Sequence, residues 1–427
     1  MEKPTVDFRE ALRVWLKVGC LGFGGPAGQI ALMHRILVDE KRWVEESRYL
    51  HALNFCMLLP GPEAQKLATY VGWLLHGVRG GLAAGILFVL PGAFVMLAVS
   101  LLYVLGRGVS VIDGALFGIK AAVLVIVVEA LIRIGRRSLK SGLLIGVAAL
   151  AFIGIFFFSL PFPLLIALAA VVGFHLAPSH AVAAVESQPG RWRQAAIATL
   201  TGIVLWWAPV AFALLLLGKE HVFVDIGIFF SKLAVVSFGG AYALMAYMAQ
   251  QAVENYGWMS APEMVDGLGL AETLPGPLIK VTQFVGFLGA YRSPEPLTPV
   301  TSAILGSALT TWVTFVPPML LIFAGAPFVE QLRANPRLSG ALNAITAAVV
   351  GVILNLTLWF VLHVLFADVT EARAGPLRWY AFDPLAIDLK VSALALIAAA
   401  LAFWLHRGLV ELVAIMAALG IAVRLLS

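Results

Sequence analysis

The sequence predicts an all-α membrane protein that crosses the bilayer many times and consists of two inverted repeats. Of its 427 residues, 61% are hydrophobic and only 12% are charged, and the mean hydropathy is +0.95. A soluble domain has about 45–50% apolar and about 25% charged residues. This composition argues against a soluble enzyme, a disordered scaffold and a coiled coil.

The charged and metal-binding residue types give no sign of a nucleic-acid or cofactor site. The formal net charge is +5, but Lys and Arg fall mostly in loops between apolar runs, where they orient a membrane protein. The two cysteines, Cys20 and Cys56, form no CxxC motif, and the eight histidines are scattered. We therefore expect no metal, no cofactor, no nucleic-acid partner and no enzymatic activity.

An internal repeat is the most informative feature of the chain. Residues 15–62 align without gaps on residues 230–277 at an offset of 215, with 13 of the 48 positions identical. The motifs FGG, W and LPGP recur at this constant spacing, which chance composition hardly produces. We predict a first repeat over 1–178, a linker over 179–221 with one transmembrane helix at about 195–217, and a second repeat over 222–427.

Each repeat contains about four apolar runs that are long enough to cross a membrane. A hydrocarbon core of about 30 Å needs about 20 helical residues. With the single run in the linker, these runs predict nine full crossings. They lie near 82–105, 113–134, 141–158, 162–177, 195–217, 301–323, 340–366, 389–405 and 409–427.

Two further stretches in each half are interrupted by glycine and proline. In the first half, residues 8–33 are broken at Gly22–Pro26 and residues 49–78 at Pro60–Pro62. Proline removes a backbone donor and clashes with the preceding turn, and glycine loosens the helix further. Each stretch is therefore predicted to form two half-helices joined by irregular backbone, as a re-entrant hairpin.

The positions of the basic residues predict the orientation of the two halves. With re-entrant hairpins, the basic loops of the first half and the N-terminus lie on the cytoplasmic side. The linker helix adds one crossing, so the second half starts on the opposite face. Its segments 249–263 and 359–366 accordingly hold no Lys or Arg. We predict inverted repeats, a cytoplasmic N-terminus and an external C-terminus.

The four interruptions are predicted to form an anion site near the bilayer midplane. Unpaired backbone groups cost several kcal/mol each in hydrocarbon, so broken helices survive only where they line a cavity or are buried in protein. Half-helix N-termini expose free N–H groups and about half a positive charge, which binds anions. The candidate substrate-binding residues are Phe23, Gly24, Gly25, Pro60, Gly61, Pro62, Lys66, Phe238, Gly239, Gly240, Pro275, Gly276, Pro277 and Lys280.

Two lysines support this interpretation. Lys66 and Lys280 follow the two PGP motifs and coincide after a one-residue slip in the alignment. They place two ammonium groups beside the hairpin apices, where a small tetrahedral dianion would bind. Glycine and proline can also serve packing alone, and a lysine can extend to the membrane surface. The duplication of both interruptions favours a functional site.

Other polar residues in apolar surroundings are candidates for ion coupling or for the pathway, because an intramembrane ionisable residue is a functional candidate by default. Structural contacts are the competing explanation for each. Lys120 and Glu129 lie nine residues apart in one run and face different sides of a helix. The full set is Glu63, Thr69, Lys120, Glu129, Glu272 and Gln283.

The doubled FGG and LPGP motifs, at Phe23–Gly25 with Leu59–Pro62 and at Phe238–Gly240 with Leu274–Pro277, resemble those of the chromate ion transporter family in its long, two-domain form. The resemblance covers nearly the whole chain. It implies a multi-pass protein of the prokaryotic inner membrane that exports chromate and confers chromate resistance, with sulfate as a competitor.

Several function classes are compatible with part of these features. The leading hypothesis is a secondary transporter for chromate, driven by the membrane potential and with proton or anion coupling as a variant. A carrier for sulfate or another oxyanion and an anion channel are the alternatives. A membrane enzyme is disfavoured because the sequence shows no catalytic constellation. A purely structural protein is disfavoured because four broken helices cost free energy in the membrane. The expected partners are chromate and the lipid bilayer; a homodimer stays open.

Overall fold

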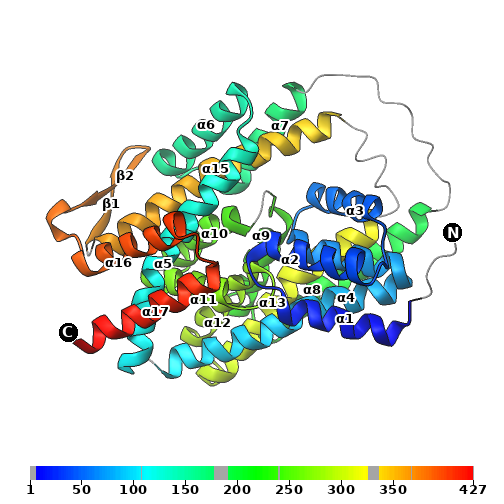
Figure 1. The fold of residues 1–427 in the computed structure, drawn as a ribbon, viewed down its shortest axis with the longest axis horizontal. Helices are drawn as coiled ribbons and strands as arrows, with labels where there is room; N and C mark the ends of the chain where they lie inside the picture. The colour runs from blue at the N-terminus through cyan, green and yellow to red at the C-terminus, as the bar shows by residue number, and fades with distance from the viewer. Residues whose placement is uncertain are drawn as a thin grey trace. The chain divides into compact units, whose positions relative to one another are not determined.

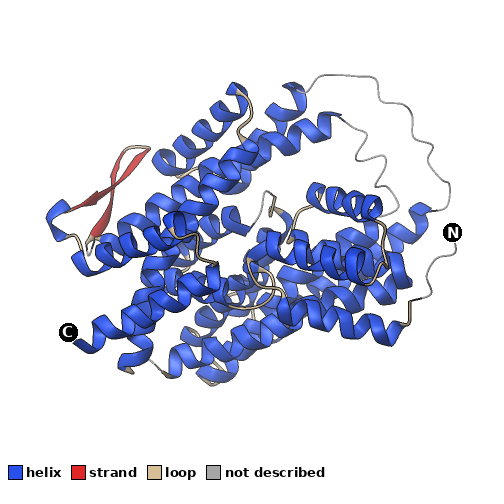
Figure 2. Cartoon of the chain, in the orientation of Figure 1, coloured by secondary structure: helices blue, strands red, loops and turns tan. Residues whose placement is uncertain are grey.

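The computed structural model describes residues 6–106, 108–176, 191–238, 241–325, 336–366 and 368–426. These parts of the chain are almost entirely helical, with one short β-hairpin among them (Figures 1 and 2). The predicted all-α membrane fold is confirmed, because the helices coincide with the apolar runs and with the interrupted stretches. The hairpin is an addition that the sequence analysis did not anticipate.

The chain divides into two compact units, and each unit contains segments from both halves of the sequence. Unit 1 comprises Met1–Ala98, Pro178–Gly240 and Leu274–Ser339. Unit 2 comprises Val99–Ala177, Ala241–Thr273 and Gly340–Ser427. The long helix α4 passes from unit 1 into unit 2 at its C-terminal end.

Unit 1 contains the first interrupted helices and the helices that pack around them. Helix α13 is central, because it packs against α8, α9 and α12. Small residues bring α12 and α13 close together: a Cβ on Gly306 would lie 2.4 Å from the Cβ of Ala290. The elements are α1 (Phe8–Leu21), α2 (Gly25–His34), η1 (Arg35–Glu40), α3 (Glu46–Leu58), α4 (Glu63–Leu105), α8 (Arg191–Leu217), α9 (Val222–Val235), η3 (Leu278–Lys280), α12 (Val281–Arg292) and α13 (Pro299–Gly325).

Unit 2 is arranged around α5, which packs against α11, α16 and α17. Glycines allow α5 and α17 to approach closely: a Cβ on Gly118 would lie 1.8 Å from the Met416 carbonyl oxygen. The elements are α5 (Ser110–Ser138), α6 (Gly142–Phe158), α7 (Phe162–Leu176), α10 (Ala241–Gln250), η2 (Gln251–Asn255), α11 (Ala261–Thr273), α15 (Pro336–Leu365), β1 (Val369–Ala374), β2 (Leu377–Phe382), η5 (Pro384–Ala386), α16 (Leu389–Ala399), η6 (Ala400–Trp404) and α17 (Leu409–Leu426).

Nine apolar helices occupy the nine runs that the sequence singles out. Within the described residues, six are long and apolar enough to span a membrane: α4, α5, the Ala196–Leu217 part of α8, α13, α15 and α17. The other three are shorter apolar helices, at Gly142–Phe158, Phe162–Leu176 and Leu389–Trp404. Only 11% of the most apolar window of α8 is buried within the protein, as expected for a surface that contacts lipid.

Helix α4 contains a sharp kink at His76 and Gly77. His76 and Gly77 have non-helical backbone angles, and Gly77 has a φ of +62°. Left-handed backbone is readily available only to glycine. The kink separates the residues predicted to form the second arm of an interrupted stretch from the apolar run at 82–105 that is predicted to cross the membrane.

Both halves also contain a short π-helix at equivalent positions. The N–H of Trp43 donates to the Leu37 carbonyl at 2.8 Å, and the N–H of Trp258 donates to the Ala252 carbonyl at 2.8 Å. All four positions obey the 215-residue offset. The recurring tryptophans therefore end the same local structure, η1 in unit 1 and η2 in unit 2.

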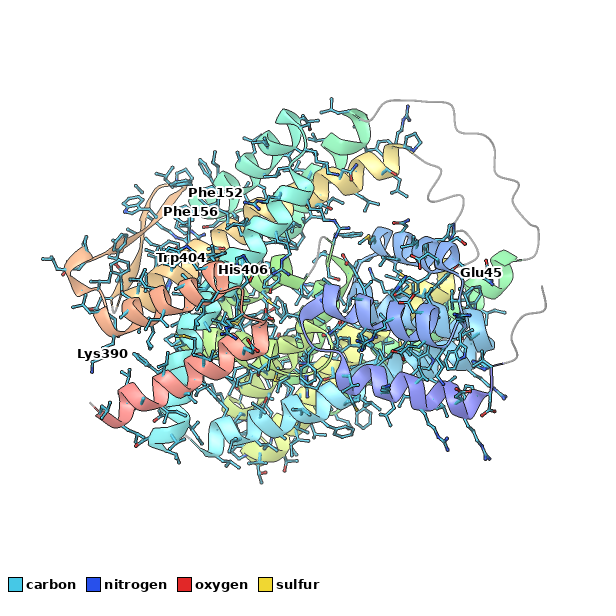
Figure 3. All side chains as sticks on the ribbon, in the orientation of Figure 1. Glu45, Phe152, Phe156, Lys390, Trp404 and His406 are labelled. Atoms are coloured by element: carbon cyan, nitrogen blue, oxygen red, sulfur yellow. The ribbon has the colours of Figure 1, made fainter. Side chains whose placement is uncertain are left out.

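The unforeseen hairpin is attached to unit 2 by a buried arginine. Strands β1 and β2 are antiparallel, with Val369 opposite Phe382. The side chain of Arg378 is 2% exposed and donates to the carbonyls of Ile155 at 2.8 Å and Phe156 at 3.1 Å. These carbonyls lie in the last turn of α6, where Phe152 and Phe156 stack (Figure 3). A cation at a helix C-terminus satisfies its free carbonyls and its dipole.

Candidate functional site

The backbone interruptions of both halves belong to unit 1. Helix α1 ends at Leu21 and α2 begins at Gly25, while α3 ends at Leu58 and α4 begins at Glu63. In the second half, α9 ends at Val235, and the segment Leu274–Pro277 precedes η3. The predicted site residues Gly239 and Gly240 lie outside the described residues. The other predicted interruption residues are grouped in one compact unit.

Two backbone hydrogen bonds connect the interruptions in equivalent pairs. The Gly61 N–H donates to the Ser237 carbonyl at 3.0 Å, and the Gly276 N–H donates to the Gly22 carbonyl at 2.9 Å. Gly61 and Gly276 are equivalent at the 215-residue offset, as are Gly22 and Ser237. The second interruption of each half therefore bonds to the first interruption of the other half.

The two PGP glycines have the same backbone conformation and equivalent neighbours. Gly61 has a φ of +103° and Gly276 a φ of +93°. A Cβ at position 61 would lie 2.6 Å from Pro318 Cγ, and one at position 276 would lie 3.5 Å from Gly92 Cα. Gly92 and Pro318 correspond at the 226-residue offset of the later alignment. Equivalent parts of α4 and α13 thus pack on the PGP segment of the other half.

Lys66 and Lys280 are buried beside these segments. Each is 1% exposed, and their ammonium groups donate to the carbonyls of Leu59 and Pro275, respectively. The acceptors belong to the interruptions themselves, whose carbonyls lack helical partners. Both lysines therefore bring a positive charge to the irregular backbone, and neither extends to a membrane surface.

A change of helix type compensates for the one-residue slip between the two lysines. Lys66 lies in the first turn of α4, four residues after Pro62. Lys280 lies only three residues after Pro277 and ends the 3₁₀ turn η3. A 3₁₀ turn has about 3.0 residues and an α turn about 3.6. The tighter turn lets the shorter spacing present its ammonium group to the equivalent backbone.

Gln29 is a buried residue of the site that the sequence analysis missed. It is 0% exposed, and its Nε2 donates to the Gly22 carbonyl at 3.1 Å and to the Gly276 carbonyl at 2.6 Å. It therefore links the first interruption of one half to the second of the other. Leu244 occupies the equivalent position, so the repeat gave no signal. A polar amide in an apolar run was the available signal.

Replacing Gln29 by leucine is expected to lower the stability of the folded protein by about 1–3 kcal/mol, because the buried carbonyls of Gly276 and Gly22 each lose a hydrogen bond, although the Gly22 carbonyl keeps the Gly276 N–H as a donor. Thermal unfolding in detergent measures this loss. Gln251→Leu, at a half-buried position in unit 2, is the control for losing an amide elsewhere. Equal unfolding temperatures for the two variants would show that Gln29 does not support the interruptions.

Two other predicted residues, Thr69 and Gln283, also lie in unit 1. The Thr69 hydroxyl donates to the Gln65 carbonyl at 2.9 Å. Gln283 Nε2 donates to the Ala93 carbonyl at 2.9 Å and to Ser307 Oγ at 2.9 Å. The buried Oε1 atoms of Gln29, Gln65 and Gln283 find no protein partner among the described residues. Such oxygens are positions where water or a solute binds.

Three predicted residues belong to unit 2 instead. Glu129 pairs with Arg133 on the exposed side of α5, with 44% and 62% of their side chains exposed. Lys120 lies 3.4 Å from Asp266, and Glu272 accepts a hydrogen bond from the Tyr242 hydroxyl at 2.6 Å. The remaining candidate, Glu63, is half-buried at the start of α4.

Comparison with known proteins places this arrangement in a family. The family model described as "Chromate transporter" matches residues 9–174 and 224–423. The chromate transport protein of Pseudomonas aeruginosa is 33% identical over 82% of this chain and 80% of its own length. The probable chromate transport protein of Synechococcus elongatus is 27% identical over 82% of this chain and 84% of its own.

The chromate transport protein of Cupriavidus metallidurans is likewise 27% identical, over 82% of each chain. No solved structure matches this chain significantly. The matched segments cover both repeats, including both pairs of interrupted stretches, and the long apolar helices identify a multi-pass membrane protein. The chain belongs to the chromate transporter family.

Proposed function

We propose that the protein is a secondary transporter that moves chromate, a tetrahedral dianion, out of the cytoplasm and thereby confers resistance to it. The observation that carries the proposal is the pairing of interrupted backbone from both halves in unit 1, with Lys66 and Lys280 buried against it. The names of the relatives in Pseudomonas and Cupriavidus support chromate as the solute.

The binding residues would act mainly through backbone N–H groups and two positive charges. Helix α2 begins at Gly25 with Pro26 in its first turn, and α4 begins at Glu63. Such helix starts carry free N–H donors and a partial positive charge. Two ammonium groups balance the two negative charges of chromate. In the present conformation these ammonium groups donate to the carbonyls of Leu59 and Pro275. The oxyanion would take the place of these carbonyls as the acceptor.

The membrane potential is sufficient to drive export. Moving one charge through 100 mV is worth about 2.3 kcal/mol, so a dianion leaving a negative-inside cell gains about 4.6 kcal/mol. At about 1.4 kcal/mol per tenfold change, this gain sustains a gradient of more than about a thousandfold. An ATP-driven step is therefore not needed for accumulation outside the cell.

The orientation in the membrane follows from the positive-inside rule. We propose that the protein lies in the prokaryotic inner membrane, with repeats 1–178 and 222–427 inserted in opposite directions around the linker 179–221. The N-terminus is then cytoplasmic and the C-terminus external. The absence of Lys and Arg from segments 249–263 and 359–366 supports this arrangement.

Flux into proteoliposomes under a controlled potassium diffusion potential tests the function. We expect saturable chromate flux toward the positive side, inhibited by excess sulfate, from vesicles containing this protein and not from empty vesicles. A current that rises linearly with concentration would instead identify an anion channel. If the vesicles transport sulfate and chromate does not inhibit this flux, sulfate and not chromate is the substrate.

A further inference from the structure

Unit 2 contains a charged cavity that is separate from the interrupted backbone of unit 1. Its volume is about 370 Å³, which is ample room for several water molecules. Residues from four helices line it, and every one of them belongs to unit 2. Of these residues, only Lys120 was a candidate from the sequence.

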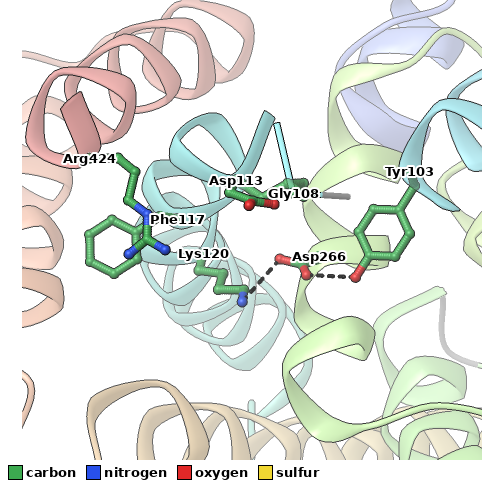
Figure 4. A pocket seen from close by; sticks show the side chains of 8 residues that line it. Tyr103, Gly108, Asp113, Phe117, Lys120, Asp266 and Arg424 are labelled. Atoms are coloured by element: carbon green, nitrogen blue, oxygen red, sulfur yellow. Dashed lines mark hydrogen bonds and ion pairs between the residues drawn. The ribbon is translucent and has the colours of Figure 1, made fainter. Parts of the chain in front are cut away.

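A buried carboxylate lies at the centre of the cavity wall. Asp266, on α11, is 4% exposed. It accepts a hydrogen bond from the Tyr103 hydroxyl at 2.9 Å, and its other oxygen lies 3.4 Å from the ammonium nitrogen of Lys120. Figure 4 shows the two side chains converging on Asp266 from opposite sides. Tyr103 comes from the end of α4 and Lys120 from α5.

The remaining charged residues of the cavity come from two helices that pack against α11. Asp113 comes from α5 and Arg424 from α17 (Figure 4). On α11 itself, Glu263 bonds to the N–H and hydroxyl of Ser260, and Glu272 bonds to Tyr242. With Lys120 and Arg424 positive and Asp113 and Asp266 negative, the formal charge of the cavity is zero.

This charge balance decides what the cavity can bind. A dianion would meet two carboxylates, and a divalent cation would meet an ammonium and a guanidinium group. A proton meets neither obstacle, since it neutralises one carboxylate and leaves the cavity with a single positive charge. Stability alone does not explain the ion pair, because Asp266 is buried while the Lys120 side chain is 25% exposed, and the desolvation of a carboxylate commonly offsets much of the attraction.

We propose that this cavity is a proton-binding site. Asp266 accepts the proton, and its protonation removes the attraction that holds the Lys120 ammonium group beside it. The cavity gives water access to the carboxylate, so the proton arrives from solvent and forms an O–H bond on Asp266. The Lys120–Asp266 pair then loses its attraction, and the contact between α5 and α11 weakens. This site deepens the proposed function, because it supplies a proton as the coupling ion.

The chain itself connects this switch to the interrupted backbone. Asp266 lies two helical turns before Thr273, which ends α11, and the next residue, Leu274, begins the second PGP segment. A change in how α11 is held therefore acts on the helix that leads directly into Pro275 and Gly276. Glu129 is a poorer proton carrier, because its ion pair with Arg133 is exposed to solvent.

An infrared pH titration of the purified protein tests proton binding without any substrate. As the pH falls from about 9 to about 4, the carbonyl band of a newly protonated carboxyl group should appear in the wild type. This change should be absent in Asp266→Asn. In Lys120→Met, its midpoint should move up by about 1–3 pH units, because the favourable positive charge is gone. Tyr103→Phe should move it in the same direction by less. Glu129→Gln, on the same helix as Lys120, is the matched control.

Transport then separates this proposal from the proposed function. With the membrane potential clamped at zero, Asp266→Asn should lose at least about tenfold of the chromate flux driven by a pH gradient, whereas Glu129→Gln should keep it. An unchanged titration in both Asp266→Asn and Lys120→Met would overturn the proton site. A wild type that titrates as expected but transports no chromate would remove the proposed function and leave the proton site standing.

Discussion

Replacement of Lys66 or Lys280 by methionine is expected to reduce chromate transport by at least about a hundredfold, equivalent to about 3 kcal/mol. Methionine keeps the length and the apolar stem of the side chain and removes its charge. Both ammonium groups are buried at the interrupted backbone, where an unscreened charge acts strongly. Flux at saturating and subsaturating chromate, measured in proteoliposomes, gives the effect on affinity and on rate.

The lysines also donate to backbone carbonyls, so a structural effect has to be separated from a loss of anion binding. Lys66→Gln and Lys280→Gln retain a donor without the charge, and Lys→Arg retains the charge with another shape. Lys390→Met, at an exposed position of unit 2 (Figure 3), is the control for losing a lysine elsewhere. If the folded Lys66 and Lys280 variants both transport chromate with unchanged affinity, the lysines have no part in binding.

Replacement of Gly61 by alanine is expected to destabilise the protein by about 2–5 kcal/mol and to abolish transport in the fraction that folds. A φ of +103° costs a non-glycine residue about 1–2 kcal/mol. The new Cβ would also lie 2.6 Å from Pro318 Cγ, and overpacking adds about 1–3 kcal/mol. Folded yield and thermal unfolding in detergent measure the loss.

The second repeat supplies the matched comparison for this variant. Gly276→Ala meets similar backbone strain, but its nearest heavy atom would be 3.5 Å away, on Gly92. It should therefore cost only about 1–2 kcal/mol. Changing Pro318 to glycine recreates the surroundings of Gly276, so the double variant Gly61→Ala, Pro318→Gly should recover the packing part of the loss. A double-mutant cycle without such coupling would argue against the contact.

Several features of the fold were accessible from the sequence because they depend on local chemistry. Apolar length sets which segments can cross a membrane, and the helices coincide with the nine predicted runs. Clustered proline and glycine interrupt a helix, and accordingly α2 begins at the last glycine of the FGG motif and α4 directly after LPGP, whereas single prolines such as Pro91 and Pro209 stay within helices. The hairpin of unit 2 was missed, since its short alternating strands are anchored mainly by the distant contact of Arg378 with α6.

The sequence by itself determined the class of the protein, its repeat and the places where its helices break, because composition, periodicity and the covalent limits of proline and glycine act within a few residues. Tertiary structure alone decided which interruptions pair, that Gln29 reaches Gly276 across 247 residues, and that Tyr103 reaches Asp266 across 163. Such partners are chosen by packing and by the need of buried polar groups for hydrogen bonds, and a single sequence contains no local signal for either.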